Sequence, residues 1–364
     1  MIDQAALQEL VGFQAKRREA PVVSLYLDVD PRTRTTDEYR LALRHLLNSV
    51  NGQATREDVN RLEQFVEQEY DRQSRGLACF SCVSEELWQA YPLMVPVQDT
   101  AFAGYRPYLK PLSDALDTFA RYGVLLVEQE GAHMFLFFMG ELEGVSGITG
   151  EDIKRHKQGG WAAARYQRHE DAAAYRNWKE AAEMTAGFVR NGQVKRLVLA
   201  GTESNVAQFA ALLPKAVQQV VVGTISADMT ENAAEIGEKS MGLIREVAEA
   251  RKDELVDELI TTAAKGGPAA LGLTNTLLAV YAGRAHHLLL DDEFTAPAYR
   301  CDNCGYVGAE DMPSCPLCGK DLRVLPDAAD SLVRWAIAQG IDLTVINDNE
   351  RLKEIGSVGA LLRY

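Results

Sequence analysis

The chain has 364 residues, 47% of them hydrophobic and 25% charged, which are proportions typical of a globular protein with two or three domains. Its formal net charge of −14 excludes a protein that coats nucleic acid with its whole surface, because phosphate would repel it. No apolar run approaches the ~20 residues that cross a bilayer, and residues 1–4 lack the basic start of a secretory signal. We therefore expect a cytoplasmic protein with no membrane contact and only local contact with polyanions.

Residues 1–115 predict an N-terminal α/β domain. The hydrophobic pattern predicts a helix over 5–18, a strand over 22–27, a helix that carries Leu41, Leu43, Leu46 and Leu47, a helix over 55–72, and strands over 76–83 and 93–97. Thr36 or Asp37 offers the side-chain oxygen that caps the second of these helices. Pro107 and Pro111 then interrupt the pattern as a connector would, which places a domain boundary near residue 115.

Strand alternates with helix through the rest of the chain, which predicts α/β sandwich domains. For the middle domain, residues 116–250, we expect strands over 124–128, 134–139, 197–201 and 219–225 and long helices over 161–190 and from Thr230. Thr202 or Ser204 caps a helix between the last two strands. For the C-terminal domain, residues 251–364, we expect helices over 271–282 and 330–339 and strands over 286–290 and 343–346.

Two C-x-x-C pairs joined by a short insert predict a metal site in the C-terminal domain. Each pair points two thiolates at one tetrahedral centre, and Gly305 and Gly319 permit the turn whose amides bond the sulfurs. A closed shell of four sulfurs favours structural zinc over free thiols or two disulfides. Residues 300–321 have little apolar sequence, so zinc binding of order ~10 kcal/mol would replace the missing core of a minidomain. The predicted ligands are Cys301, Cys304, Cys315 and Cys318.

Cys79 and Cys82 have the same spacing but lie in an apolar run. Strand geometry places residues three apart on opposite faces of a sheet. A redox pair would require a helix start after the first cysteine, and a second zinc site would require two more ligands. We therefore expect buried core thiols at both positions.

The segment from Lys154 to Arg168 carries five Lys or Arg and no acid, inside a strongly acidic chain. Its cations can neutralise phosphates, and its two adjacent glycines allow close approach to another backbone. Trp161 could stack on a nucleobase or staple the loop to its own helix, and the segment could equally be a solvated basic loop. The candidate RNA-binding residues are Lys154, Arg155, His156, Lys157, Gly159, Gly160, Trp161, Arg165 and Arg168.

The usual catalytic templates are poorly represented. Lys239-Ser240 resembles the end of a phosphate loop, but Ala233 and Glu238 stand where its two glycines are needed. His286-His287 begins an apolar strand and is interpreted as a strand-edge pair rather than a ligand set. There is no nucleophile elbow and no H-E-x-x-H helix.

Three segments in register resemble the archaeal and eukaryotic class-one peptide-release factors and Pelota. They are Gly159 to Arg168, Val198-Leu199-Ala200-Gly201-Thr202, and Ser357 to Tyr364, and together they place the resemblance over about residues 120–364. The resemblance implies a three-domain release-factor-like architecture of α/β sandwich domains. The two cysteine pairs also resemble the zinc minidomain of the archaeal members.

This chain departs from the release factors at both of their functional signatures. In those proteins the middle-domain loop reads Gly-Gly-Gln and promotes peptidyl-tRNA hydrolysis, whereas Trp161 stands here at the glutamine position. A bulky indole would occupy the space that water and ester need, so we expect no hydrolysis and no catalytic residue. The Asn-Ile-Lys-Ser stop-codon motif is also absent. The loop after Val29 instead places Arg32 and Arg34 on the decoding-centre side.

In lacking both signatures, the chain resembles the bacterial branch of the family, which includes the Balon-type ribosome hibernation factors. That resemblance implies a protein that fills the vacant A site of an idle ribosome, contacts rRNA, and arrives with a translational GTPase such as EF-Tu. No DNA contact is expected. Two other hypotheses remain: a release or rescue factor that hydrolyses peptidyl-tRNA, and a release-factor fold repurposed for a non-ribosomal partner.

Overall fold

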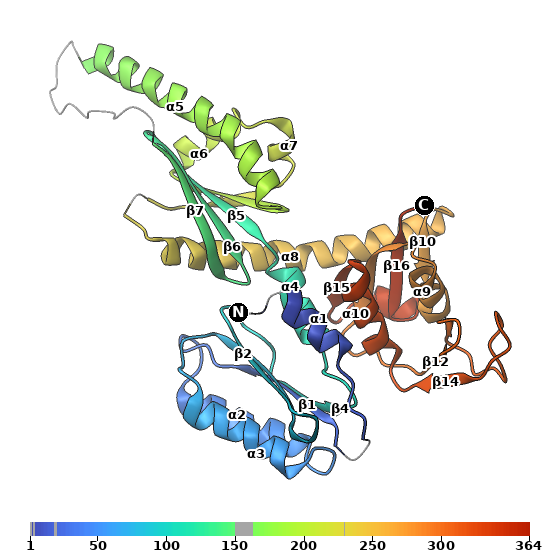
Figure 1. Ribbon diagram of the computed structural model, residues 1–364. Helices are drawn as coiled ribbons and strands as arrows, with labels where there is room; N and C mark the ends of the chain where they lie inside the picture. The colour runs from blue at the N-terminus through green and yellow to red at the C-terminus, as the bar shows by residue number, and fades with distance from the viewer. Residues whose placement is uncertain (1, 3, 18–19, 150–162, 229) are drawn as a thin grey trace. The chain divides into compact units, whose positions relative to one another are not determined.

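The computed structural model describes residues 2, 4–17, 20–149, 163–228 and 230–364 (Figure 1). The chain divides into two compact units. The first unit comprises residues 1–117 and 250–364, and the second comprises residues 118–249. The predicted mixed α/β fold is confirmed, whereas the division into three domains at residues 115 and 250 stays a prediction. Within the described parts of the chain, every helix is too short or too polar to cross a lipid bilayer.

The N-terminal part of the first unit is an antiparallel sheet covered on one face by two helices. Its strands, in the spatial order β3-β2-β1-β4, are β1 (Val22–Asp28), β2 (Gly76–Cys82), β3 (Leu87–Leu93) and β4 (Thr100–Gly104). Apolar side chains of α2 (Thr36–Ser49) and α3 (Arg56–Gln64) pack with the inward residues of β1 and β2. Helices α1 (Gln4–Gly12) and α4 (Lys110–Thr118) flank this sheet in sequence.

Several boundaries in this part of the chain differ from the sequence expectation. The helix predicted over 5–18 ends at Gly12, and the helix predicted over 55–72 becomes α3 followed by a π-helical turn, Phe65–Glu69. Helix α2 is capped by Thr35 rather than Thr36 or Asp37, because Glu38 completes a capping box with it. The Glu38 carboxylate accepts the Thr35 backbone N–H at 2.7 Å, and the Thr35 hydroxyl accepts the Glu38 N–H at 3.4 Å. The strand predicted over 93–97 lies instead at Leu87–Leu93, an edge strand, where a proline such as Pro92 is tolerated.

The second unit is a five-stranded sheet with helices on both faces. Its strands, in the order β7-β6-β5-β8-β9, are β5 (Tyr122–Glu128), β6 (Gly131–Phe138), β7 (Glu141–Thr149), β8 (Arg196–Gly201) and β9 (Val221–Ile225). Helices α5 (Ala163–Asn191), α6 (Glu203–Ala210) and α7 (Lys215–Gln218) pack on one face. The start of α8 (Ala233–Ala264) packs on the other, where Gly237 lies against the Phe137 ring.

The C-terminal part of the first unit contains a mixed sheet and a small antiparallel sheet. The mixed sheet has the order β10-β16-β11-β15 and comprises β10 (Ala269–Leu271), β11 (Ala285–Asp291), β15 (Asp342–Ile346) and β16 (Val358–Leu362). The end of α8 and α11 (Glu350–Glu354) pack on one face of it. Helices α9 (Gly272–Tyr281) and α10 (Ala328–Gln339) also contact this sheet. The small sheet has the order β13-β12-β14 and comprises β12 (Ala298–Cys301), β13 (Val307–Gly308) and β14 (Leu322–Leu325).

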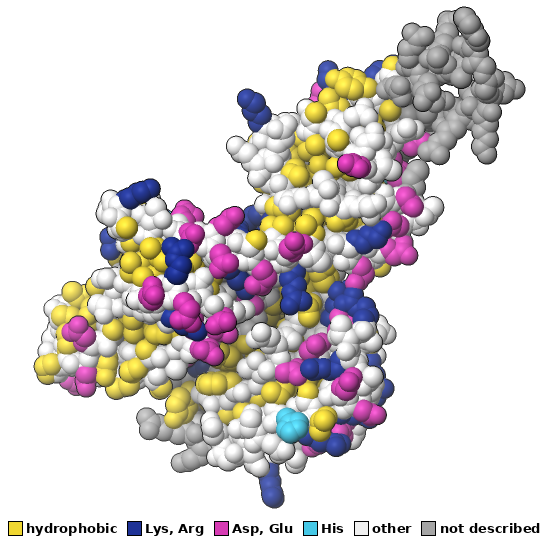
Figure 2. Space-filling model, turned by 180° about the vertical axis from the view of Figure 1, so that it is seen from behind, with side chains coloured by type: hydrophobic (Ala, Val, Ile, Leu, Met, Phe, Trp, Pro, Cys, Tyr) yellow, Lys and Arg dark blue, Asp and Glu magenta, His cyan; other side chains and the backbone are white. Residues whose placement is uncertain are grey.

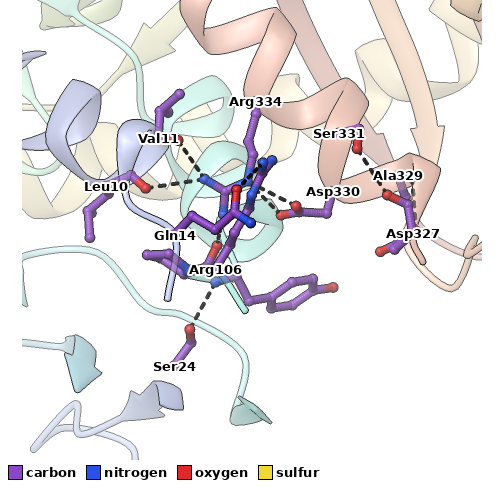
Figure 3. A network of polar contacts seen from close by, with 12 residues as sticks. Leu10, Val11, Gln14, Ser24, Arg106, Asp327, Ala329, Asp330, Ser331 and Arg334 are labelled. Carbon is purple, nitrogen blue, oxygen red and sulfur yellow. Dashed lines mark hydrogen bonds and ion pairs between the residues drawn. The ribbon is translucent and has the colours of Figure 1, made fainter. Parts of the chain in front are cut away.

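A buried arginine joins the two parts of the first unit (Figure 3). The Arg334 side chain on α10 is 4% exposed, and its Nε donates to both carboxylate oxygens of Asp330 at 3.1 and 2.9 Å. Its Nη1 donates to the carbonyls of Leu10 and Val11 at 3.2 and 2.9 Å, and its Nη2 donates to the Pro107 carbonyl. Leu10 and Val11 lie in the last turn of α1, where carbonyls lack helical partners, so the cation caps that helix.

We expect Arg334→Ala to lower the free energy of unfolding of the first unit by about 3–5 kcal/mol, because it leaves a partly buried carboxylate and three carbonyls without their donor. Urea titration followed by fluorescence measures the change. The matched control is Arg351→Ala, which removes an exposed ion pair with Asp257 and should cost less than about 1 kcal/mol. Equal losses of unfolding free energy in the two variants would show that the buried bonds of Arg334 contribute no more to stability than an exposed ion pair.

Candidate functional site

The two C-x-x-C pairs fold into two turns of the same backbone design. The Gly305 N–H donates to the Cys301 carbonyl at 2.9 Å, and the Gly319 N–H donates to the Cys315 carbonyl at 2.8 Å. Both glycines adopt positive φ, +78° and +69°, which a residue with a Cβ rarely adopts. The glycine after each pair is therefore a requirement of the turn, as predicted from the sequence.

The turns bring the four sulfurs together. All four Sγ atoms lie within 4.8 Å of one another, with Cys301 and Cys318 at 3.4 Å and Cys304 and Cys315 at 3.5 Å. Four thiolates around an ion at about 2.3 Å would be about 3.8 Å apart, so the arrangement suits one tetrahedral metal ion. The backbone amide of Lys320 bonds the Cys318 sulfur and lowers the pKa of that thiol to about 6. The predicted convergence of the four cysteines is thus confirmed, and they could hold a metal ion.

The small sheet around these cysteines has little core of its own. Its buried apolar side chains, apart from cysteines, are Ala298, Val307 and Leu325, whereas Leu317 and Val324 are 61% and 56% exposed. Burial on this scale cannot offset the conformational entropy of ordering more than twenty residues. Apart from contacts with α9, such as the bond from the Tyr281 hydroxyl to the Cys304 carbonyl at 3.2 Å, the cysteine cluster is the remaining source of stability for this part of the chain.

Cys79 and Cys82 are buried free thiols, as predicted. Cys79 belongs to the core beneath α2 and α3, and burial raises its pKa to about 12. The Cys82 sulfur lies elsewhere, 3.5 Å from the Ala20 carbonyl. Neither thiol has the low pKa of a redox-active cysteine.

The basic segment lies largely outside the described residues. The residues that lie wholly outside are Lys154, Arg155, His156, Lys157, Gly159, Gly160 and Trp161. Arg165 and Arg168 belong to the first turns of α5, but their side chains are not among those described. The segment connects the edge strand β7 to α5. Trp178 fixes α5 to the sheet by donating its indole N–H to the Glu128 carbonyl. The RNA-binding role of the segment therefore stays a prediction.

The loop from β1 to α2 holds both predicted arginines in ion pairs. The Arg32 Nε donates to Asp30 at 2.8 Å, and the Arg34 Nη1 donates to Asp99 at 2.8 and 3.0 Å. Asp99 also accepts the Asp28 N–H at 2.8 Å, so these contacts set the path of the loop. Their role at a decoding centre stays a prediction, and their charges are balanced by Asp30 in the loop and by Asp99 just before β4.

The other motifs have structural explanations. Gly201 ends β8 with φ at +142°, and a Cβ there would lie 2.7 Å from the Val127 carbonyl. Thr202 rather than Ser204 caps α6 and accepts the Asn205 N–H at 3.3 Å. His287 is buried, with its Nε2 2.9 Å from the Thr344 hydroxyl, so the structure supports a structural histidine in this strand.

Charge is not segregated on the face shown in Figure 2, where acidic and basic side chains are interspersed among the described residues.

The cysteine cluster was predicted from the sequence, whereas the polar network of Arg334 was not. The carbonyls of Leu10, Val11 and Pro107 that Arg334 bonds lie more than two hundred residues away in the chain, so no local spacing marks them.

Comparisons with known proteins agree with the resemblance. Residues 107–245 match the family described as Bacterial archaeo-eukaryotic release factor family 10. The chain is 23% identical to peptide chain release factor subunit 1 of Thermococcus kodakarensis, over 98% of this chain and 96% of the relative. It is also similar to ribosome-bound archaeal Pelota with ABCE1 (TM-score 0.40, 16% identity, 79% and 77% of the two chains) and to Dom34 of S. cerevisiae (TM-score 0.39, 10% identity, 81% and 82%). Residues 107–245 thus match a family of bacterial archaeo-eukaryotic release factors, and the chain as a whole is similar in sequence to archaeal peptide chain release factors.

Proposed function

We propose that this protein binds the A site of idle ribosomes and occupies it without hydrolysing peptidyl-tRNA. The observation that carries the proposal is Trp161, which follows Gly159 and Gly160 where release factors have glutamine. The match of residues 107–245 to a release-factor family and the similarity to archaeal release factors support the ribosome as the partner.

The chemistry of the substitution supports occupancy over hydrolysis. Glutamine offers a compact amide with both donor and acceptor atoms, whereas an indole offers one donor and a large apolar ring. The ring fills the space that a water molecule and the ester carbonyl require together. It also provides a flat face on which an unstacked rRNA base can lie.

The basic segment supplies the rRNA contact at the peptidyl-transferase centre in this proposal. Its candidate residues are Lys154, Arg155, His156, Lys157, Gly159, Gly160, Trp161, Arg165 and Arg168. The loop with Arg32 and Arg34 lies on the decoding-centre side. Because those two cations are paired with carboxylates, we expect this loop to contribute shape rather than net charge.

Zinc is the metal that the four cysteines favour, because an all-thiolate tetrahedral site suits its preferences. Bound there, zinc would hold the small sheet together and supply no reactivity, since four sulfurs leave no open position. A translational GTPase such as EF-Tu is the proposed delivery partner, and the sequence has no phosphate loop of its own.

The test of function is peptidyl-tRNA hydrolysis on programmed ribosomes, with and without a stop codon in the A site. We expect release at the rate of the no-factor control, because Trp161 excludes water from the ester. An archaeal release factor with an intact Gly-Gly-Gln loop is the positive control. Stop-codon-dependent release well above background would replace the occupancy proposal with the release or rescue hypothesis.

A further inference from the structure

A groove with a volume of about 450 Å³ lies inside the first unit, between two edge strands. Residues 102–104 of β4 and the following Tyr105 and Arg106 form one wall, and residues 323–327, from β14 onward, form the other. Residues 14–16 after α1, and Asp330 and Ser331 of α10, complete the lining. The groove is separate in sequence from the cysteine turns and from the basic segment.

The cation in the wall of this groove has no carboxylate partner. Arg106 is half-buried, and among the described residues its guanidinium donates only to the neutral amide oxygen of Gln14, at 2.8 Å (Figure 3). Burial lowers its pKa, as do the neighbouring charges of Arg334, Arg323 and Arg300, partly offset by Asp330. A half-buried charge that lacks an anion is costly unless a ligand supplies one.

The opposite wall also carries a positive charge that is only weakly compensated. Arg323 of β14 lies directly opposite Arg300 of β12 in the antiparallel register, where two like charges are destabilising. The Nε of Arg300 is buried without a hydrogen-bond partner, and Arg323 has a 3.4 Å ion pair with the exposed Asp302. An exposed pair of this kind is worth little. A sequence that retains such a conflict without compensation marks a functional surface.

The carboxylates of the groove are already engaged and do not balance these arginines. Asp330 accepts both bonds from Arg334. Asp327 caps α10 by accepting the Ala329 N–H at 2.9 Å and also faces the Thr295 hydroxyl at 3.3 Å. The groove therefore presents positive charge at Arg106, which has no ion pair among the described residues, and at Arg323, whose pair with Asp302 is exposed and weak.

Aromatic rings stand beside these cations. Phe102 and Tyr105 are 42% and 38% exposed, and the Phe102 ring stacks on Tyr108 with centroids 4.8 Å apart. Arginines next to exposed aromatic rings are the means by which proteins hold phosphates and unstacked bases of single strands. An extended peptide fits less well, because the Ala15 N–H already bonds the Tyr105 carbonyl just beyond β4.

We propose that this groove binds single-stranded RNA, with a backbone phosphate between Arg106 and Arg323 and a base against Phe102. The site lies outside the basic segment of residues 154–168, so it adds a second RNA contact to the one in the proposed function. A volume of about 450 Å³ is in the range of small-ligand sites and excludes a duplex.

The test is fluorescence anisotropy of a 5′-labelled hexa-adenylate titrated with the full chain across a salt series. We expect saturable binding that Phe102→Ala weakens about fivefold or more. Arg106→Ala with Arg323→Ala should weaken it further and flatten the salt dependence by up to about 1.4 logarithmic units, as expected for one strand contacted by two cations. Arg323→Glu alone changes an exposed residue, so this variant should keep the fold while it weakens RNA binding.

Arg56→Ala is the matched control, because Arg56 is an exposed arginine on α3 away from the groove residues, and it should leave binding unchanged. No saturable binding, or equal weakening by the control, would overturn the proposal. The proposal would also be overturned if only the combined replacement of Lys154, Arg155 and Lys157 with glutamate abolished RNA binding. Tighter binding of an oligo-glutamate peptide than of RNA would overturn it as well. Ribosome sedimentation is a separate measurement, so failure of the groove and failure of ribosome binding are distinguishable.

Discussion

Replacing Cys301 or Cys315 with serine is expected to remove one equivalent of zinc from the protein and to unfold residues 298–325. Each substitution opens a closed four-sulfur shell, and the small sheet has only three buried apolar side chains besides its cysteines. Zinc binding in such sites is worth of order ~10 kcal/mol, far more than that core provides. Elemental analysis gives the metal content, and limited proteolysis within 302–321 reports the unfolding.

Cys82→Ser is the control for the zinc experiment, because Cys82 has the same C-x-x-C spacing but lies buried away from the cluster. It should retain the full zinc content. A chelator should reproduce the proteolysis of the Cys301 and Cys315 variants in the wild-type chain. Unchanged metal content in both variants would contradict the four-thiolate site.

Replacing Lys154, Arg155 and Lys157 with glutamate is expected to weaken binding to vacant ribosomes and to flatten its salt dependence. Each cation that contacts phosphate releases a counterion, so loss of three contacts should reduce the slope by about 2–3 logarithmic units. Sedimentation with ribosomes over a salt series measures both effects. Trp161→Ala should behave differently, since lost stacking costs ~1–3 kcal/mol with little change in slope.

The matched control is glutamate at Lys179, Arg190 and Lys195, three exposed cations in the same unit. It changes the formal charge by the same amount, so it separates the local contact from the overall acidity of the chain. Equal loss of binding in the two triple variants would defeat the model of a basic contact loop.

The elements that the sequence predicted well are those in which one local pattern dominates. The β-branched and aromatic run at 22–27 became the buried strand β1, and the paired cysteines with their following glycines became matching turns. The cap of α2 was misplaced by one residue because the signal was the Thr35–Glu38 pair rather than either neighbour alone. Local chemistry thus predicted half of the described strands and the cysteine cluster, and it missed others such as β4, β7 and β16.

Features that depend on distant parts of the chain could not be predicted. Arg334 finds its acceptors at Leu10, Val11 and Pro107, and nothing in the sequence around α10 indicates them. The groove likewise combines residues near 15, 105 and 325, which only the folded first unit brings together. Arg106 directly precedes Pro107 of the predicted connector and carries no motif, whereas its partial burial in the groove gives it a candidate role.

The most direct test of the central proposal is a cryo-EM map of ribosomes incubated with the protein, or purified from stationary-phase cells that express it. We predict density for the chain in the A site, with Gly159, Gly160 and Trp161 next to rRNA at the peptidyl-transferase centre and the loop of Arg32 and Arg34 toward the decoding centre. Ribosomes with an empty A site at saturating protein concentration would contradict the proposal.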